Sequence, residues 1–348
     1  MILDDPKEIE RIDISKVVKV MDKFPEQCEE GIEIGRKFVK KLEREKPGRV
    51  CVCGMGGSGI AGDILAGAFP DRDIRVFKGY ELPKYIGKGD LVFAVSYSGN
   101  TEETLSVFRE AERRGYEIIA VTSGGELERE CVKHSIDYVK IPKGIKPRFS
   151  LGYLLFPIIV ILEKIKFLKK QKLDLVVKNL RETREEIWTE TPAKDNPAKR
   201  IAMKLVDSVP VVQGFGIYEP IAYRTRTQFN ENSKIPSFSE NFPELDHNSI
   251  LGWEGGGYLT RNFSVILIRD DKEGGKIWER IEFTKKLLRK SVKYVVEVWS
   301  LYPHELSRML STMYVLDFVT VYLGLLRNKD PGDDSLLLKL KTILKKGE

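Results

Sequence analysis

The feature that most constrains the fold is an apolar run, Leu91–Val95, that leads directly into a loop rich in hydroxyls and glycine. An apolar run of this length is typical of a strand buried in a parallel sheet. The loop, residues 96–104, precedes apolar residues at helical spacing. Its hydroxyl-bearing and glycine residues are Ser96, Ser98, Gly99, Thr101 and Thr104. Such a loop at the positive end of a helix dipole can bind a phosphate. An ordinary capped turn uses similar residues, but packing alone does not require so many hydroxyls, so we favour a phosphate site.

Further candidate strands lie on both sides of this run, at residues 49–54, 74–77, 117–122 and 137–141, with helical segments between them. Regular alternation of strands and helices predicts a doubly wound parallel sheet flanked by helices. In such a sheet ligands bind at the carboxyl ends of the strands. The loop at residues 96–104 occupies one of these ends.

A second glycine-rich loop follows the first strand. Gly54, Gly56 and Gly59 match the spacing G-x-G-x-x-G of dinucleotide-binding folds, and Asp71 and Asp73 lie near the distance expected for a ribose-binding acid. A nicotinamide-dependent dehydrogenase is therefore one alternative. The pattern is weak taken alone, and a dinucleotide fold does not require the hydroxyl-rich turn that follows the later strand.

Both loops resemble those of the sugar isomerase (SIS) domain, and nearly all of the chain resembles the archaeal-type bifunctional phosphoglucose/phosphomannose isomerases. The segments that carry the resemblance are MGGSGIAGD, SYSGNTEET, KGIKPRFSLGY, FNENSK and PELDHNSILGWE. The resemblance implies that Gly56 and Gly57 let the backbone approach the sugar. It also implies that the phosphate is held by Ser58, Ser96, Ser98 and Thr101. Arg148, in the proline–arginine segment, would enter the active site, where a guanidinium can stabilise negative charge on substrate oxygens.

The chain divides into two halves around a highly charged stretch that ends in two prolines. We predict an N-terminal SIS subdomain with a helical lead-in at residues 1–165, a charged helix and linker at 166–200, and a C-terminal SIS subdomain at 201–348. Candidate strands at 209–214, 264–268 and 294–299 make the second half a coarse repeat of the first. The fold predicted is α/β: two doubly wound parallel sheets flanked by helices, plus a C-terminal helix.

The resemblance places the chemistry in the second half. We expect a helix after Tyr218 that ends near Asn232, with Glu231 at that end between two asparagines. His247 lies in a polar turn. Composition alone would make Glu231 a solvated residue at a helix end. In the family that the chain resembles, the glutamate at this position is the catalytic base, and the histidine matching His247 assists opening of the sugar ring.

These residue types suit the isomerisation of an aldose to a ketose. The reaction opens a ring and moves a proton between C1 and C2 through a cis-enediol(ate). A histidine can give and take a proton near neutral pH. A glutamate placed against the C–H bond can act as the base. The chemistry requires no metal or redox cofactor, and we predict none.

The C-terminal segment predicts a short amphipathic helix that begins near Asp333 or Asp334. On a helical wheel Lys341 projects inside the apolar stripe, whereas Lys339 projects to the far side. The resemblance implies that a lysine here joins the histidine in ring opening, and Lys341 is the candidate. The threonine that the family places shortly before this lysine, associated with accepting both epimers, has no clear match. Ser335 is the nearest hydroxyl, so use of mannose 6-phosphate is the less secure expectation.

Composition excludes several classes of protein. The net charge is +6, but basic and acidic residues are interleaved, which argues against nucleic-acid binding. The longest apolar run, around residues 151–162, contains Pro157, and the N-terminus lacks a signal-peptide pattern, so we expect a soluble cytoplasmic protein without membrane contact. Abundant Lys, Glu and Arg suggest a thermophile. The four cysteines lack metal-site spacing and predict reduced, buried thiols.

The sequence leaves a second class of function open. A SIS domain can also serve as a sugar-phosphate sensor that binds without reacting, since fold does not fix function. No helix-turn-helix for binding DNA is evident at either end, which counts against a sensor. The resemblance further implies a homodimer with its sites near the interface, in which His247 comes from the partner chain.

Overall fold

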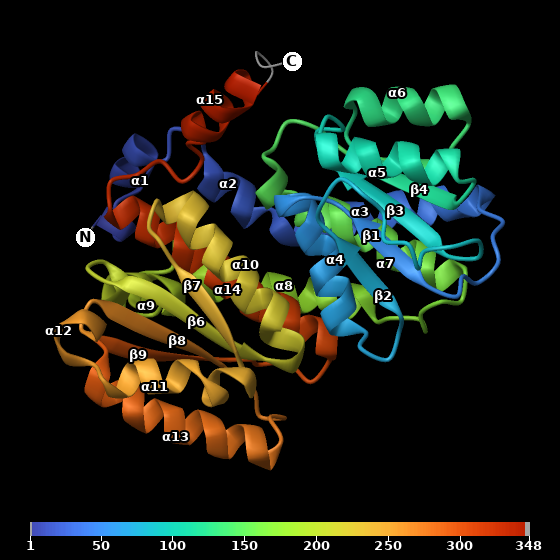
Figure 1. Ribbon diagram of the computed structural model, residues 1–348. Helices are drawn as coiled ribbons and strands as arrows, with labels where there is room; N and C mark the ends of the chain where they lie inside the picture. The colour runs from blue at the N-terminus through green and yellow to red at the C-terminus, as the bar shows by residue number, and fades with distance from the viewer. Residues whose placement is uncertain (1, 345–348) are drawn as a thin grey trace. The chain divides into compact units, whose positions relative to one another are not determined.

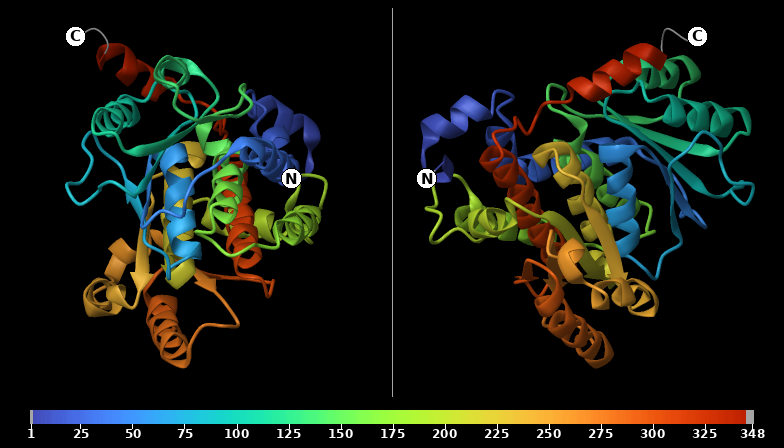
Figure 2. Two further views of the ribbon diagram at one scale, coloured as in Figure 1. Left: turned by 90° about the vertical axis from the view of Figure 1, so that its right-hand side faces the viewer. Right: turned by 60° about the vertical axis from the view of Figure 1, so that its left-hand side comes forward.

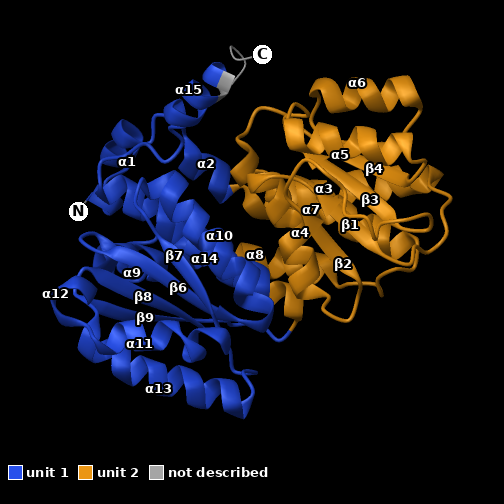
Figure 3. Ribbon diagram, viewed as in Figure 1, with its two compact units in different colours: residues 1–22, 182–303, 308–348 blue, residues 23–181, 304–307 orange. Residues whose placement is uncertain are grey.

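The computed structural model describes residues 2–344, apart from the side chains of Lys341 and Leu344. The chain forms two compact units, each built around its own parallel sheet (Figures 1 and 3). Unit 1 comprises residues 1–22, 182–303 and 308–348, and unit 2 comprises residues 23–181 and 304–307. Helix α8 (Leu173–Ile187) runs from unit 2 into unit 1.

The sheet of unit 2 has five parallel strands in the order β2-β1-β3-β4-β5. The strands are β1 (Val50–Cys53), β2 (Ile74–Phe77), β3 (Leu91–Ser96), β4 (Glu117–Thr122) and β5 (Tyr138–Lys140). Every residue of β1 and β3 is buried. Central strands covered by helices on both faces are expected to be apolar throughout rather than alternating, as the run at 91–95 predicts.

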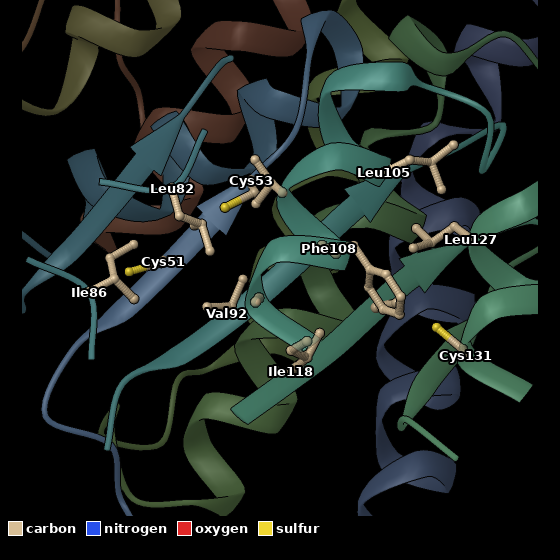
Figure 4. Packing of buried hydrophobic residues seen from close by; sticks show 14 residues of the cluster. Cys51, Cys53, Leu82, Ile86, Val92, Leu105, Phe108, Ile118, Leu127 and Cys131 are labelled. Carbon is tan, nitrogen blue, oxygen red and sulfur yellow. The ribbon is translucent and has the colours of Figure 1, made fainter. Parts of the chain in front are cut away.

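Helices cover both faces of this sheet (Figure 1). On one face lie α5 (Glu102–Arg113) and α6 (Gly125–His134), and on the other lie α3 (Phe24–Phe38), α4 (Gly56–Ala68) and α7 (Leu151–Lys164). Figure 4 shows the core under α5, where Phe108 packs among side chains of the strands and of α6. All four cysteines are buried and free, as predicted, and burial raises the pKa of the Cys51 thiol to about 12.

The sheet of unit 1 has four parallel strands in the order β7-β6-β8-β9. The strands are β6 (Val209–Phe215), β7 (Phe238–Phe242), β8 (Phe263–Arg269) and β9 (Tyr294–Trp299). Helices α10 (Glu219–Gln228) and α14 (Glu305–Leu326) lie on one face, and α11 (Ser249–Glu254) and α13 (Gly275–Ser291) lie on the other (Figure 1). The remaining helices are α1 (Pro6–Ile12), α2 (Val17–Asp22), α9 (Pro197–Leu205), α12 (Gly257–Thr260) and α15 (Ser335–Leu344).

Helix α14 lies on one face of the unit 1 sheet and is almost entirely buried. In the part of the chain that the structure describes, it is the one helix whose length and apolar composition would allow it to cross a membrane, but 89% of its apolar stretch is buried inside the protein. That burial is typical of a core helix. The run at residues 151–162, which the sequence analysis takes as the longest apolar one, is therefore shorter than this buried apolar helix.

The fold class is confirmed, including two parallel sheets and a C-terminal helix. Strand β7 was not predicted. Its central residues, Ser239, Glu240 and Asn241, are polar and only half-buried because β7 is an edge strand. The N-terminal residues 1–22 group with unit 1, whereas the sequence places them beside the first sheet. They are held there by polar contacts such as the Tyr314 hydroxyl donating to the Met21 carbonyl, 2.7 Å.

Candidate active site

The two loops singled out in the sequence meet at the carboxyl edge of the unit 2 sheet. Strands β1 and β3 are neighbours, yet α4 follows β1 on one face and α5 follows β3 on the other (Figure 1). The chain therefore leaves these two strands in opposite directions, and the crevice at such a switch point is where open α/β sheets bind ligands. The loops touch: the Tyr97 amide donates to Ser58 Oγ at 3.1 Å.

Hydroxyls gather at this switch point. Ser58 and Ser96 are buried, Thr101 is half-buried and Ser98 is exposed. Ser96 Oγ accepts a bond from the Gly99 amide at 3.1 Å and lies 3.0 Å from Thr101 Oγ1. Ser58 and Ser98 also accept bonds from backbone amides. A hydroxyl that accepts such a bond still has its proton to donate. Ser58 and Ser98 thus keep their protons for an anion, as does whichever of Ser96 and Thr101 accepts the bond between them.

Arg148 lies beside the first loop. It belongs to the 3₁₀ turn Pro147–Phe149, its side chain is 5% exposed, and its guanidinium carbon lies 4.7 Å from the centre of the Phe149 ring. A Cβ added at Gly57 would lie 2.7 Å from the backbone nitrogen of Arg148. The glycine therefore allows the backbone of the Arg148 turn to rest directly on the first loop, beside Gly57.

Two residues that the sequence analysis missed hold this arrangement together. The Tyr97 hydroxyl accepts a bond from the Ile145 amide at 3.1 Å, and burial raises the pKa of this phenol. Tyr97 therefore ties the switch-point loop to the segment that leads to Arg148. Gln27, buried in α3, donates to the Phe149 carbonyl and accepts from the Gly152 amide, both at 2.8 Å. The place of Tyr97 between two hydroxyl residues could have drawn attention to it, whereas nothing in the sequence marks Gln27.

We expect Gly57→Ala to lower kcat at least about tenfold and to destabilise unit 2 by roughly 1–3 kcal/mol, because the new methyl group overlaps the backbone of the Arg148 turn. Steady-state kinetics and thermal unfolding measure the two effects. Gly79→Ala is the control, since a Cβ there meets no atom within 4 Å. Equal activity of the two variants would show that the contact at Gly57 does not position Arg148.

Glu231 lies in unit 1, in a turn that continues α10. Residues Phe229–Ser233 form one π-helical turn after Gln228, and Lys234 ends it with φ +54°. Isolated π turns of this kind are frequent at functional sites. Glu231 itself is half-buried, whereas Asn232 and Ser233 are buried. The sequence prediction of a helix ending near Asn232 agrees with this turn.

His247 ends the 3₁₀ turn Glu244–His247, and it is exposed in the single chain. The preceding residue fixes this turn on α13: Asp246 accepts bonds from Arg280 at 3.0 Å and from Thr284 at 3.1 Å. A histidine held on a rigid turn yet open to solvent is available to a substrate or to a second chain.

Lys341 lies in α15, but its side chain is outside the described residues, so its direction is not described. Ser335 begins α15, is exposed, and donates its backbone amide to Asp333 Oδ1 at 3.0 Å, as the predicted helix start requires. Helix α15 projects away from the sheet of unit 1 (Figures 1 and 2). Its exposed apolar side chains are Leu336, Leu337, Leu338, Leu340 and Ile343.

The unit 1 sheet has an equivalent switch point between β6 and β8, but charged side chains lie there instead of hydroxyls. Between β6 and β8 the Tyr218 hydroxyl donates to Asp270 at 2.5 Å, and Arg308 donates to the same carboxylate at 2.6 Å. These bonds lower the pKa of Asp270 although burial opposes them. Beside it the fully buried Arg269 pairs with Glu282 at 2.8 Å and with Glu273. Carboxylates occupy the place that hydroxyls have in unit 2, so this edge is unsuited to a phosphate.

Comparison with known proteins identifies both halves of the chain. Residues 42–156 match the SIS domain, and residues 194–344 match the bacterial phospho-glucose isomerase C-terminal SIS domain. A crystal structure of a hypothetical protein from Thermus thermophilus has the same fold, with a TM-score of 0.76 at 16% identity over 98% of this chain and 93% of that one.

Curated relatives cover almost the whole chain. The bifunctional phosphoglucose/phosphomannose isomerase of Caldicellulosiruptor bescii is 36% identical over 88% of this chain and 93% of its own length. The protein of the same name from Aquifex aeolicus is 33% identical over 96% of this chain and 99% of its own length.

Proposed function

Since the chain belongs to the bifunctional phosphoglucose/phosphomannose isomerase family and is an isomerase, we propose that it interconverts glucose 6-phosphate, and mannose 6-phosphate, with fructose 6-phosphate. Membership in this family argues against the nicotinamide-dependent dehydrogenase that the G-x-G-x-x-G spacing suggested. The reaction moves a proton within the sugar and consumes no oxidant, so we propose that it proceeds without a cofactor.

The observation that carries this proposal is the group of oriented hydroxyls between β1 and β3. Ser58, Ser96, Ser98 and Thr101 lie on two touching loops at the switch point, at the start of α4 and α5. The N-terminus of a helix favours negative charge, and hydroxyl protons can bind three phosphate oxygens at once. We assign the sugar 6-phosphate group to this site, with the open space beside Gly56 available to the sugar.

In the proposed mechanism His247 and Lys341 open the sugar ring. One group gives a proton to the ring oxygen O5 while the other accepts the proton of the C1 hydroxyl, which leaves the open-chain aldehyde. Imidazole suits this exchange because its ordinary pKa lies near the working pH. His247 is exposed in the single chain, as a residue that acts in the active site of a partner chain would be.

Glu231 then moves the proton between C2 and C1. Its carboxylate takes the C2 proton, the electrons of that bond form the C1–C2 double bond of the cis-enediol(ate), and the carbonyl oxygen gains negative charge. Arg148 stabilises this charge, since a guanidinium interacts strongly with an oxyanion in a site shielded from water. The proton of the C2 hydroxyl then passes to the C1 oxygen, which becomes the C1 hydroxyl. As the C2 oxygen forms the carbonyl, the electrons of the C1–C2 double bond take the proton back from Glu231 at C1, and open-chain fructose 6-phosphate results.

We further propose that the enzyme works as a cytoplasmic homodimer in the exchange of hexose phosphates during glycolysis and gluconeogenesis, with His247 contributed by the partner chain. The apolar side chains that α15 exposes in the single chain support an assembly that covers them. The composition rich in Lys, Glu and Arg supports a thermophilic source.

One assay separates this proposal from a sugar-phosphate sensor. Glucose 6-phosphate and mannose 6-phosphate are supplied in turn, with a chelator present, and fructose 6-phosphate is measured by a coupled enzyme. We expect turnover of glucose 6-phosphate with kcat of at least about 1 per second. Turnover of mannose 6-phosphate should be slower, because the threonine that the family associates with use of both epimers has no clear match here and Ser335 is only the nearest hydroxyl. Binding without turnover would make the protein a sensor.

A further inference from the structure

The turn that carries Glu231 has an unusual ending. Lys234 adopts φ +54° and ψ 43°, a left-handed conformation that residues other than glycine seldom take. Its amide donates to the Phe229 carbonyl and so closes the π turn. Strained backbone of this kind persists only where the surroundings fix it, and it is concentrated at functional sites. Lys16, Ser135, Lys166 and Asn328 have a similar φ, so it is the side-chain contacts of Lys234, rather than its backbone, that set it apart.

One side of the turn is fixed by α14. Asn232 Nδ2 donates to Thr320 Oγ1 at 2.9 Å, and Ser233 Oγ donates to the Thr320 carbonyl at 2.5 Å. A Cβ added at Gly324 would lie 2.5 Å from the Asn232 carbonyl oxygen, so helix and turn are in direct backbone contact. These contacts fix the position of the turn along α14.

The lysine side chain makes the other connection. Lys234 Nζ donates to the backbone carbonyl of Glu231 and, at 2.6 Å, to the backbone carbonyl of Asp333. Asp333 in turn accepts the amide of Ser335, the first residue of α15. One ammonium group therefore joins the residue assigned as the base to the point from which the helix bearing Lys341 starts.

We propose that Lys234 is a positioning residue that fixes the Glu231 turn and the start of α15 relative to each other. The proposal rests on the roles proposed above for Glu231 and Lys341. Helix α15 projects from unit 1, so its direction depends on how its first turn is attached (Figures 1 and 2). Catalytic groups must be held within about 0.5 Å of their productive geometry, and an ammonium bonded to both carbonyls supplies that restraint.

Three substitutions test the role of the ammonium. Lys234→Met keeps the length of the side chain and removes its charge and donors. Lys234→Gly also removes the ammonium, but glycine accepts the left-handed conformation without strain, so this variant remains folded. Lys234→Arg keeps charge and donors. The matched control is Lys293→Met, since Lys293 Nζ also donates to a backbone carbonyl, that of Asp207 at 3.1 Å, elsewhere in unit 1.

We expect Lys234→Met and Lys234→Gly to lower kcat for glucose 6-phosphate about 10- to 100-fold with KM within about threefold of the wild type, because misplacement of catalytic groups by about 1 Å has effects of this size. Lys234→Arg should recover most of kcat, and Lys293→Met should retain it. Exchange NMR distinguishes the two steps: interconversion of the substrate anomers reports ring opening, and exchange of the C2 proton reports the base. Both should slow in the methionine and glycine variants.

Wild-type kcat in the folded glycine variant would overturn the proposal, as would an equal loss in Lys293→Met or slowing of only one of the two NMR exchanges. Glu231→Gln measured alongside separates the two claims. If that variant is active, the proposed base is wrong. If it is inactive while Lys234→Met and Lys234→Gly are fully active, only the positioning role of Lys234 is wrong.

Discussion

Glu231→Gln should lower kcat for fructose 6-phosphate by about 10³- to 10⁴-fold, at the upper end of what a general base contributes, while KM changes by less than about threefold. Glutamine has the shape of glutamate but accepts no proton at neutral pH, so the enediol(ate) cannot form. The hydroxyls of Ser58 and Ser96, to which we assign the phosphate, belong to other segments of the chain and are unchanged. The rate is measured by coupling glucose 6-phosphate formation to a dehydrogenase, and binding is measured by calorimetry.

Glu219→Gln provides the control for this experiment. Glu219 begins α10, the helix that leads to Glu231, and we assign it no part in the reaction. It should keep wild-type kcat. If Glu231→Gln retains more than about a tenth of the wild-type kcat, Glu231 is not a general base that raises the rate by two orders of magnitude or more.

The second large effect is expected on stability. Arg224 of α10 donates to both oxygens of Asp317 of α14, at 2.8 to 3.1 Å, and both side chains are at most 5% exposed. Arg224→Met leaves the Asp317 carboxylate buried beside an apolar side chain, which should destabilise unit 1 by about 3–5 kcal/mol. Thermal unfolding measures the loss. Lys276→Met, which removes an exposed partner of Glu279, should leave the unfolding temperature unchanged.

Two further measurements test the physical cause. Arg224→Met combined with Asp317→Leu should be more stable than Arg224→Met alone, because no buried charge remains. Burial raises the pKa of Asp317 although Arg224 opposes the rise, and removal of Arg224 should raise the pKa further. A carboxyl whose pKa is higher in the folded state than when unfolded binds protons on folding, so the stability of Arg224→Met should increase as the pH falls from about 8 to about 5. A variant whose stability does not change over this interval would contradict the assignment of the loss to Asp317.

Much of the fold could be predicted from the sequence because most strands are buried in parallel sheets. The runs at 91–95 and 118–121 are apolar on both faces, and such segments are recognisable without knowledge of their neighbours. Strand β7 could not be found in this way, since an edge strand half-open to solvent has a mixed sequence. The grouping of residues 1–22 with unit 1 depends on long-range contacts such as Ser15 with Asp330, 2.6 Å, which local patterns do not encode.

The candidate site was predictable as residue types but not as an arrangement. The hydroxyls and glycines of the two loops stand out in the chain, and the strand order that brings them together follows from pairing between distant segments. The residues that hold the Arg148 turn in place could not be predicted for the same reason. Gln27 contacts this turn, although more than a hundred residues separate the two in the sequence. Glu231, His247 and Lys341 came from resemblance to a family, and their roles remain proposals.

A crystal structure of Glu231→Gln with bound fructose 6-phosphate tests the central claim most directly. In the mechanism proposed above, the hydroxyls of Ser58, Ser96 and Thr101 bind the phosphate and Glu231 acts on the sugar carbons. We predict phosphate oxygens within about 3.2 Å of the hydroxyls of Ser58, Ser96 and Thr101, with the amide that replaces the Glu231 carboxylate beside C1 and C2. Phosphate bound elsewhere, or sugar carbons remote from residue 231 of every subunit, would contradict the account.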